Sequence, residues 1–256
     1  MSMMDRLQAR PRVVALDGDD TLWHNETMFV TSHERFRALL LRHVDLPPER
    51  IDAWLLDTER RNLKTYGYGI KGFVLSMVET AIEATGGRIP AGDIAELLRF
   101  GRAMLDHPVE LIGGAEQAIE ALRQAGCELW LVTKGDLFDQ ESKIARSGLA
   151  ERFDRIEILS EKDTHAYRRL LARHGVAPEE FVMAGNSLRS DVLPVSELGG
   201  LACYVPYHLT WAHEQVGDPG GIPFLTLRSL RELPDVLRRL PGADCPGSGP
   251  PPSLRS

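Results

Sequence analysis

The residues best suited to chemistry form a short acidic stretch, Asp17-Gly18-Asp19-Asp20-Thr21, directly after the apolar run at residues 12–16. Three carboxylates this close repel one another, and a divalent cation bound among them would relieve the repulsion. Mg²⁺ prefers oxygen ligands and commonly takes one or two carboxylates together with phosphate and water. The stretch therefore favours a magnesium site, and an acidic turn that caps a following helix is the alternative.

Three further polar groups also follow apolar runs. The segment Thr133-Lys134-Gly135 offers a hydroxyl and backbone amides, and Lys162 follows the next run. Asn186 and Asp191 follow the fourth. Taken singly, each has an ordinary explanation: a threonine that ends a strand, a solvated lysine, or an Asn-Ser helix cap. All of them follow strands of the same polarity, where open parallel sheets bind ligands, so together they indicate one polar site.

The elements that would position these groups can be recognised from hydrophobic patterns. Five apolar runs have the length of buried strands, and they lie at residues 12–16, 128–132, 155–159, 181–184 and 201–205. Helical segments separate most of them, at 139–148 and 163–174, and Asp163 and Gly175 are suited to begin and end the second. We therefore expect an α/β fold with a doubly wound, mostly parallel, Rossmann-like sheet.

The alternation is interrupted once, between the first strand and the second. Four helical patterns separated by proline and glycine fill this interval, at residues 32–43, 48–63, 73–84 and 92–105. We predict an inserted all-helical cap domain at 24–108 and a catalytic core formed by 12–23 and 109–240. Residues 1–11 are expected to form an N-terminal tail, and residues 241–256, which have little apolar content, a disordered C-terminal tail.

The composition narrows the class of protein. The 256 residues are 43% hydrophobic and 26% charged, and no apolar stretch approaches membrane-spanning length. A formal net charge of −7 and the lack of a basic run with interleaved aromatic residues argue against nucleic acid as a partner. The N-terminal segment has no secretory apolar core, so we expect a cytoplasmic protein that does not bind membranes. Cys127, Cys203 and Cys245 have no metal-type spacing, and we expect reduced thiols.

The polar groups, in this order, resemble the four motifs of the haloacid dehalogenase-like hydrolase superfamily. The first motif, Asp-x-Asp-x-Thr, is similar to Asp17, Asp19 and Thr21. The second motif is a Thr or Ser, which Thr133 matches. The helical insertion between these two motifs also resembles the helical cap of that superfamily.

The third and fourth motifs extend the resemblance over nearly the whole chain apart from its tails. The third is a lysine, matched by Lys162. The fourth is usually an acidic pair, and here it is matched by Asn186 and Asp191. Asn186 is the one departure, because it replaces a charged group with a neutral oxygen of similar reach, which puts the strength of metal binding in doubt.

The resemblance implies a magnesium-dependent hydrolase that cleaves phosphate monoesters of a small metabolite. Asp17 is then the nucleophile, which attacks phosphorus in line and becomes an aspartyl phosphate. Asp19 must start protonated, because it gives a proton to the departing alcohol and later takes one from the hydrolytic water. The implied Mg²⁺ ligands are the Asp17 carboxylate, the Asp19 backbone carbonyl, Asp191 and Asn186.

The resemblance also implies how the substrate is held. Thr133 and Lys162 would donate hydrogen bonds to phosphoryl oxygens, with Lys134 and Gly135 completing the substrate-binding groups of the core.

Substrate choice would then come from the cap. The cap segment from Asn62 to Gly72 carries Lys64, Tyr66 and Tyr68, which could close over a phosphorylated ligand. An ordinary interhelical loop with solvated lysines is the alternative for this segment.

Four alternatives to a phosphatase remain at this point. A 2-haloacid dehalogenase needs no acid for a departing halide, so Asp19 favours phosphate esters. A phosphomutase uses the same core, and a non-catalytic metal-binding protein is open because of Asn186. A signalling receiver module also phosphorylates an aspartate, but it has no place for the helical insertion. A small phosphorylated metabolite is the expected partner, and a homodimer is left open.

Overall fold

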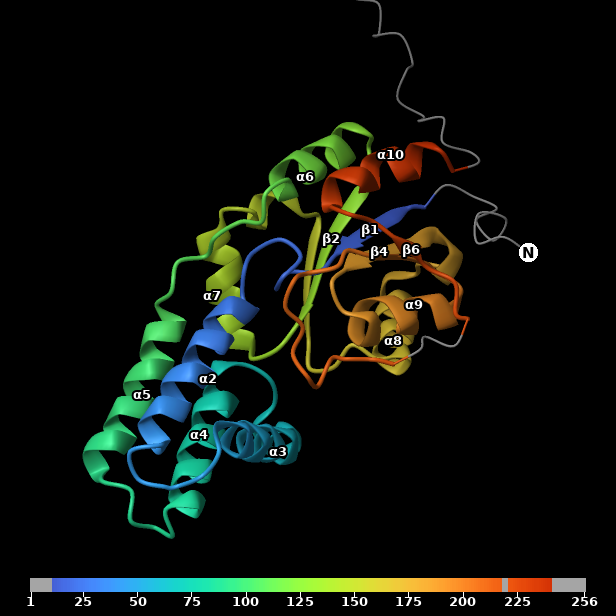
Figure 1. Ribbon diagram of the computed structural model, residues 1–256. Coiled ribbons are helices and arrows are strands. Elements are labelled where there is room, and N and C mark those ends of the chain that lie inside the picture. The colour runs from blue at the N-terminus through green and yellow to red at the C-terminus, as the bar shows by residue number, and fades with distance from the viewer. Residues whose placement is uncertain (1–10, 218–220, 241–256) are drawn as a thin grey trace, which may run out of the picture.

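The computed structural model describes residues 11–217 and 221–240. Its centre is a six-stranded parallel sheet in the order β3-β2-β1-β4-β5-β6 (Figure 1). The strands are β1 (Val13–Leu16), β2 (Glu128–Lys134), β3 (Arg155–Leu159), β4 (Phe181–Gly185), β5 (Leu201–Tyr204) and β6 (Leu225–Thr226). The predicted α/β, doubly wound fold is confirmed, and the two-residue edge strand β6 is additional to the five expected strands.

The central strand β1 divides the apolar core into two layers. Val14 and Leu16 pack in a cluster with α6 (Ala115–Gln124), α7 (Leu137–Ser147) and α10 (Leu233–Arg238). Val13 and Ala15 pack in a second cluster with α8 (Thr164–His174) and α9 (Leu193–Leu198), on the opposite face (Figure 1). This alternation is the period of two that a strand imposes. Because every strand is parallel, all carboxyl ends lie at one edge of the sheet.

Local signals in the sequence explain where the core helices begin and end. The Asp163 side chain accepts a hydrogen bond from the Ala166 amide at 2.7 Å, and Gly175 adopts a left-handed conformation with φ 60°. Both features were predicted for α8 and are confirmed. Helix α7 begins at Leu137, two residues earlier than expected, because the Asp136 side chain caps it by accepting from the Asp139 amide.

Between β1 and β2, the four helices that precede α6 form the helical insert: α2 (Glu26–Leu40), α3 (Pro48–Tyr66), α4 (Ile70–Ala84) and α5 (Ala91–Leu105) (Figure 1). They surround an apolar cluster of their own, which includes Phe36, Leu55, Met77 and Leu97. Helix α2 begins six residues before the predicted start, because the Asp20 carboxylate accepts hydrogen bonds from the first amides of the helix. The domain limits at 24–108 stay a prediction.

The remaining described elements are short: a π-helical turn at Leu188–Val192 and 3-10 turns at Ala150–Arg152, Pro178–Glu180 and Leu230–Glu232. In the part of the chain that the structure describes, every helix is too short or too polar to cross a membrane. The predicted C-terminal tail at 241–256, with Cys245, and residues 1–10 of the predicted N-terminal tail lie outside the described residues.

The contact between α4 and α5 gives a test of packing in the helical insert. A Cβ atom at Gly101 would lie 2.4 Å from Val74 Cγ2, so this close approach requires glycine. We expect Gly101→Ala to lower the free energy of unfolding by roughly 1 kcal/mol, because overpacking of 1–3 kcal/mol exceeds the gain in helix propensity. Urea denaturation measures this change. Val74→Ala should make the same substitution neutral or stabilising, and a strictly additive double mutant would contradict the packing explanation.

Candidate active site

Asp17 follows the central strand β1 and lies at the middle of the carboxyl edge of the sheet. Its backbone amide donates to the Ala184 carbonyl of β4 at 3.0 Å, which fixes the backbone between two strands. Its carboxylate is buried, with 6% of the residue exposed, and receives hydrogen bonds on both oxygens. Lys162 Nζ donates to Oδ1 at 2.5 Å and Thr21 Oγ1 donates to Oδ2 at 3.1 Å. Asp17 is therefore held in one orientation by residues from two different loops.

Lys162 connects Asp17 with Asp191. Its Nζ atom also donates to Asp191 Oδ1 at 2.7 Å, and all three side chains are buried. Burial and the neighbouring Asp191 together raise the pKa of Asp17 to about 7, although Lys162 opposes both effects. Burial alone would lower the pKa of Lys162, but the two carboxylates outweigh it and raise that pKa. The lysine ammonium thus balances two buried carboxylates that face the same point.

The oxygens around Asp17 suit a hard divalent cation. In the orientation found here, the Asn186 side-chain oxygen faces two other acceptors, the Asp19 carbonyl oxygen and Asp17 Oδ2. If the amide were turned over, its nitrogen would donate to these two atoms at 3.2 and 3.3 Å. The Thr21 hydroxyl reaches both side-chain oxygens, at 3.1 Å from Asp17 Oδ2 and 3.4 Å from Asn186 Oδ1. Three oxygens that converge around so few donors form a set that a cation satisfies.

The candidate site for Mg²⁺ contains few charged ligands. Its carboxylates are Asp17 and Asp191, and no group of three or more His, Cys, Asp or Glu side chains in the described chain is arranged to hold a metal. Mg²⁺ characteristically keeps several waters and binds one or two carboxylates, so this donor set fits it. Gly185 allows Asp191 to approach the strand, since a Cβ atom there would lie 2.2 Å from Asp191 Oδ2.

Asp19 lies beside this cluster but faces a different set of donors. Trp23 Nε1 donates to Oδ1 at 2.7 Å and Gln140 Nε2 donates to Oδ2 at 2.8 Å. Lys143 Nζ contacts both oxygens, at 2.8 and 2.7 Å. Burial would raise the pKa of Asp19, but Lys143 and the other donors lower it overall. The expectation that Asp19 starts protonated is not supported, because these contacts favour the carboxylate.

The end of β2 supplies Thr133 and Gly135. Thr133 is buried and its hydroxyl donates to Gln140 Oε1 at 3.3 Å, so Gln140 joins Thr133 to Asp19. Gly135 has φ 143°, a conformation that favours glycine, and its amide donates to the Leu159 carbonyl at 3.2 Å. That amide is already satisfied by β3, so the structure gives no support to Gly135 as a phosphate donor.

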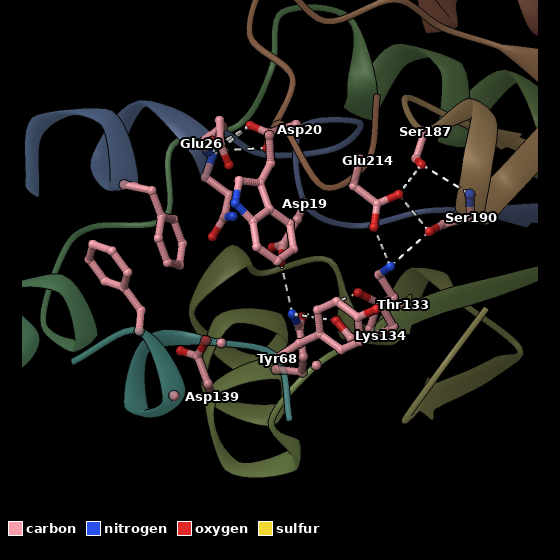
Figure 2. A pocket seen from close by; sticks show the side chains of 18 of the residues that line it. Asp19, Asp20, Glu26, Tyr68, Thr133, Lys134, Asp139, Ser187, Ser190 and Glu214 are labelled. Atoms are coloured by element: carbon pink, nitrogen blue, oxygen red, sulfur yellow. Dashed lines mark hydrogen bonds and ion pairs between the residues drawn. The ribbon is translucent and has the colours of Figure 1, made fainter. Parts of the chain in front are cut away.

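Lys134 is tied into a network with the loop after β5. Its Nζ atom contacts Glu214 Oε1 at 2.5 Å and Ser190 Oγ at 2.8 Å (Figure 2). Glu214 also accepts hydrogen bonds from the hydroxyls of Ser187 and Ser190 (Figure 2). Although burial raises the pKa of Glu214, Lys134 and the two serines lower it to about 2. Glu214 was not identified from the sequence, and no motif marks it.

The predicted cap residues divide into two groups. Tyr68 lines the cavity above the site, packs 4.2 Å from Lys134 Nζ by its ring centroid, and donates its hydroxyl to Glu161 at 2.8 Å. It also packs edge-on against Trp211 of the loop after β5. Lys64 and Tyr66 are exposed and are not among the residues that line the cavity, so the structure does not bring them to the site.

Several residues of the site were not predicted as functional. Asp20 has φ 59°, which is unusual for a residue other than glycine, and caps α2. His24 makes a hydrogen bond of 2.6 Å with Tyr207. Trp23 is fully buried beneath Gly18 and donates to Asp19. The contacts of Asp20 and Trp23 are local, within six residues along the chain, but they match no standard cap or motif. The contact of His24 depends on a distant segment, because Tyr207 lies 183 residues further along the chain.

Comparisons with known proteins agree with this geometry. A family model described as haloacid dehalogenase-like hydrolase matches residues 11–199. A phosphoserine phosphatase from Thermus thermophilus is 32% identical over 160 residues, which are 60% of this chain and 61% of that protein. The chain thus spans less than two thirds of the length of that relative.

Solved structures share the whole fold. A haloacid dehalogenase-like family hydrolase from Xanthomonas campestris is 42% identical, covers 91% of this chain and 96% of its own, and superimposes with a TM-score of 0.79. A 2-haloacid dehalogenase from Pseudomonas syringae, 19% identical with a TM-score of 0.58, covers 90% of this chain and 99% of its own and shares the fold alone. The chain belongs to the haloacid dehalogenase-like hydrolases.

Proposed function

We propose that this hydrolase is a magnesium-dependent phosphatase that cleaves monoesters of a small metabolite through a phosphoryl group carried on Asp17. The observation that carries this proposal is the buried Asp17-Lys162-Asp191 arrangement beside the converging oxygens of Asn186 and Asp19. A nucleophilic carboxylate and a metal site must share one point in such chemistry. The match to a phosphoserine phosphatase supports phosphate esters as the class of substrate.

Mg²⁺ would be held by the carboxylates of Asp17 and Asp191, the Asn186 side-chain oxygen and the Asp19 backbone carbonyl. When bound, it supplies charge neutralisation between the anionic ester and the carboxylates, and it polarises the phosphoryl group. Asn186 can serve with its neutral oxygen because Asp191 supplies the charge. For this reason the replacement of an acid by Asn186 is compatible with activity.

The chain's own residues can orient the nucleophile and the phosphoryl group. Lys162 and Thr21 restrain one oxygen each of Asp17, which holds the carboxylate in a single position for in-line attack. The Thr133 hydroxyl lines the same cavity and can turn from Gln140 to a phosphoryl oxygen. Lys162 can shift its donation toward the charge that develops on phosphorus.

Asp19 is proposed as the group that exchanges protons with the leaving alcohol and the hydrolytic water. Its contacts with Lys143 and the other donors lower the pKa of Asp19 and favour the carboxylate, which suits the second half of the reaction, when it accepts a proton from water. A proton must reach Asp19 with the substrate before it can serve the leaving group. A dehalogenase needs no such group, so the presence of Asp19 at the cavity favours the phosphatase over that alternative.

The cavity above the site has a volume that suits a small-molecule substrate. Its volume is about 170 Å³, and the core, the helical insert and the loop after β5 all contribute to its lining. We propose that the helical insert acts as a cap and that Tyr68 and Trp211 help enclose the leaving group.

The cytoplasmic location and the homodimer stay predictions.

The charges that line the cavity bear on the leaving group. Among the described lining residues there is no arginine, and each lysine is paired with a carboxylate. Asp20, Glu26 and Glu59, by contrast, have no ion pair with Lys or Arg among the described residues. Burial, together with the nearby Asp20 and Glu59, raises the pKa of Glu26 to about 8, so this part of the cavity disfavours a further negative charge. We therefore propose a leaving group that is neutral or cationic rather than one that carries a carboxylate.

The first test is the hydrolysis of para-nitrophenyl phosphate with Mg²⁺ and with a chelator. We expect turnover that requires the metal and that falls at least about 10³-fold in Asp17→Asn, because the amide is not a nucleophile. Asp235→Asn removes a matched carboxylate on α10, outside the cavity, and should retain full activity. Undiminished turnover in Asp17→Asn would refute the assigned nucleophile.

The charge of the leaving group can be tested with three esters of similar size: phosphoethanolamine, phosphoserine and phosphoglycolate. We expect kcat/KM to be at least about 10-fold higher for phosphoethanolamine than for phosphoglycolate, because the acids Asp20, Glu26 and Glu59 disfavour a further negative charge in the cavity. Phosphoserine, which has both groups, should lie between them. Glu59→Gln should reduce the difference in kcat/KM between phosphoethanolamine and phosphoglycolate. Glu83→Gln, on the exposed face of α4, should leave this difference unchanged. A preference for phosphoglycolate would contradict the proposed leaving-group class.

A further inference from the structure

Lys143 is a buried lysine of α7 that no motif identified. Its side chain is 8% exposed, and its Nζ atom contacts both oxygens of Asp19. It also lies 3.5 Å from Asp139 Oδ2 and 3.3 Å from Asn25 Oδ1. Asp19 lies in the loop after β1, Asp139 lies on α7, and Asn25 directly precedes α2 of the helical insert. Lys143 therefore joins three segments around one carboxylate.

The contacts of Lys143 fix the direction of the Asp19 carboxylate. A lysine that donates to both oxygens restrains rotation of the carboxyl group, and Trp23 and Gln140 each hold one oxygen from the side. Asp19 nevertheless lines the cavity, and 23% of its side chain is exposed. The restrained carboxylate thus keeps an accessible surface toward the position of a reacting water.

We infer that Lys143 is a positioning residue that holds the Asp19 carboxylate to receive a proton from the water that hydrolyses the Asp17 phosphate. This inference rests on the proposed function. In that step a water oxygen forms a bond to phosphorus as the bond from phosphorus to Asp17 Oδ breaks. The water proton passes to Asp19, and inorganic phosphate leaves. Lys143 touches neither the water nor the phosphoryl group, and it acts through Asp19.

Kinetic constants that report different halves of the reaction can distinguish a positioning role of Lys143 from a purely structural role. The value of kcat/KM reports steps up to transfer of the phosphoryl group to Asp17, whereas kcat includes hydrolysis of the phosphorylated enzyme. We expect Lys143→Met to lower kcat by roughly 10²-fold, near the lower end of general-base effects, and to change kcat/KM by less than about 3-fold. A burst of para-nitrophenol equal to the enzyme concentration should appear in rapid-mixing experiments with para-nitrophenyl phosphate.

Conservative variants keep the test valid if Lys143→Met folds poorly. Lys143→Arg should restore much of kcat, because it can also donate to both oxygens. The double variant Lys143→Met/Asp139→Asn removes one of the carboxylates left unpaired, so it should fold while showing the same burst. Arg152→Met removes an exposed ion pair with Glu120 and should change neither kinetic constant. Equal losses in kcat and kcat/KM without a burst, in a folded variant, would overturn the positioning role.

Asp19→Asn distinguishes failure of this inference from failure of the proposed function. If Asp19→Asn accumulates phosphorylated enzyme and Lys143→Met does not, only the role of Lys143 is wrong. If the wild-type chain hydrolyses no ester, the proposed function fails, and crystal structures still test the inference. The Asp19 side chain should leave its present orientation in Lys143→Met. An unchanged orientation would refute the positioning role of Lys143.

Discussion

The ion pair that Lys162 makes with Asp17 and Asp191 is the constraint on which the site depends. Two carboxylates buried within reach of one lysine would be strongly unfavourable without that ammonium group. The requirement explains why three segments meet where they do: Asp17 follows β1, Asp191 lies on the π-helical turn after β4, and the loop after β3 carries the lysine. The parallel sheet places these ends at one edge, so the fold and the charge balance determine the site together.

Two further ion pairs lie next to this one and involve other parts of the structure. Lys143 and Asp19 pair at the side of the helical insert, whereas Lys134 and Glu214 pair at the side of the loop after β5. Each lysine in the cavity is thereby satisfied by the protein itself. The phosphoryl group must draw on donors that are already in use, so binding should rearrange hydrogen bonds in the site.

The sequence was sufficient for the parts of the structure that follow from local pattern. Apolar runs identified five of the six strands, and Asp163 and Gly175 marked the limits of α8. The motif residues Asp17, Thr133, Lys162, Asn186 and Asp191 all line one cavity, as strand polarity required. The start of α2 was placed too late because the capping group, Asp20, lies five residues before Asn25 and not at the usual cap position.

The rest of the site depends on tertiary contacts that have no spacing signature. Gln140 and Lys143 lie on α7, more than one hundred residues from Asp19, and Glu214 reaches Lys134 from the loop after β5. Lys64 and Tyr66 looked suitable by composition, but the position of α3 leaves them exposed outside the cavity. Residue type suggested ligands in the cap, whereas only helix orientation could decide which of them face the site.

The most direct measurement of the central claim is to identify the residue that carries the phosphoryl group. The enzyme would be mixed with ³²P-labelled substrate and Mg²⁺ and quenched in acid within milliseconds. One portion would be assayed for protein-bound ³²P, and a second would be reduced with borohydride, which releases the phosphate, and mapped by mass spectrometry. We expect a base-labile label on the protein in the first portion and conversion of Asp17 to homoserine in the second. Label on any other residue, or complete turnover with no labelled protein at any time, would contradict it.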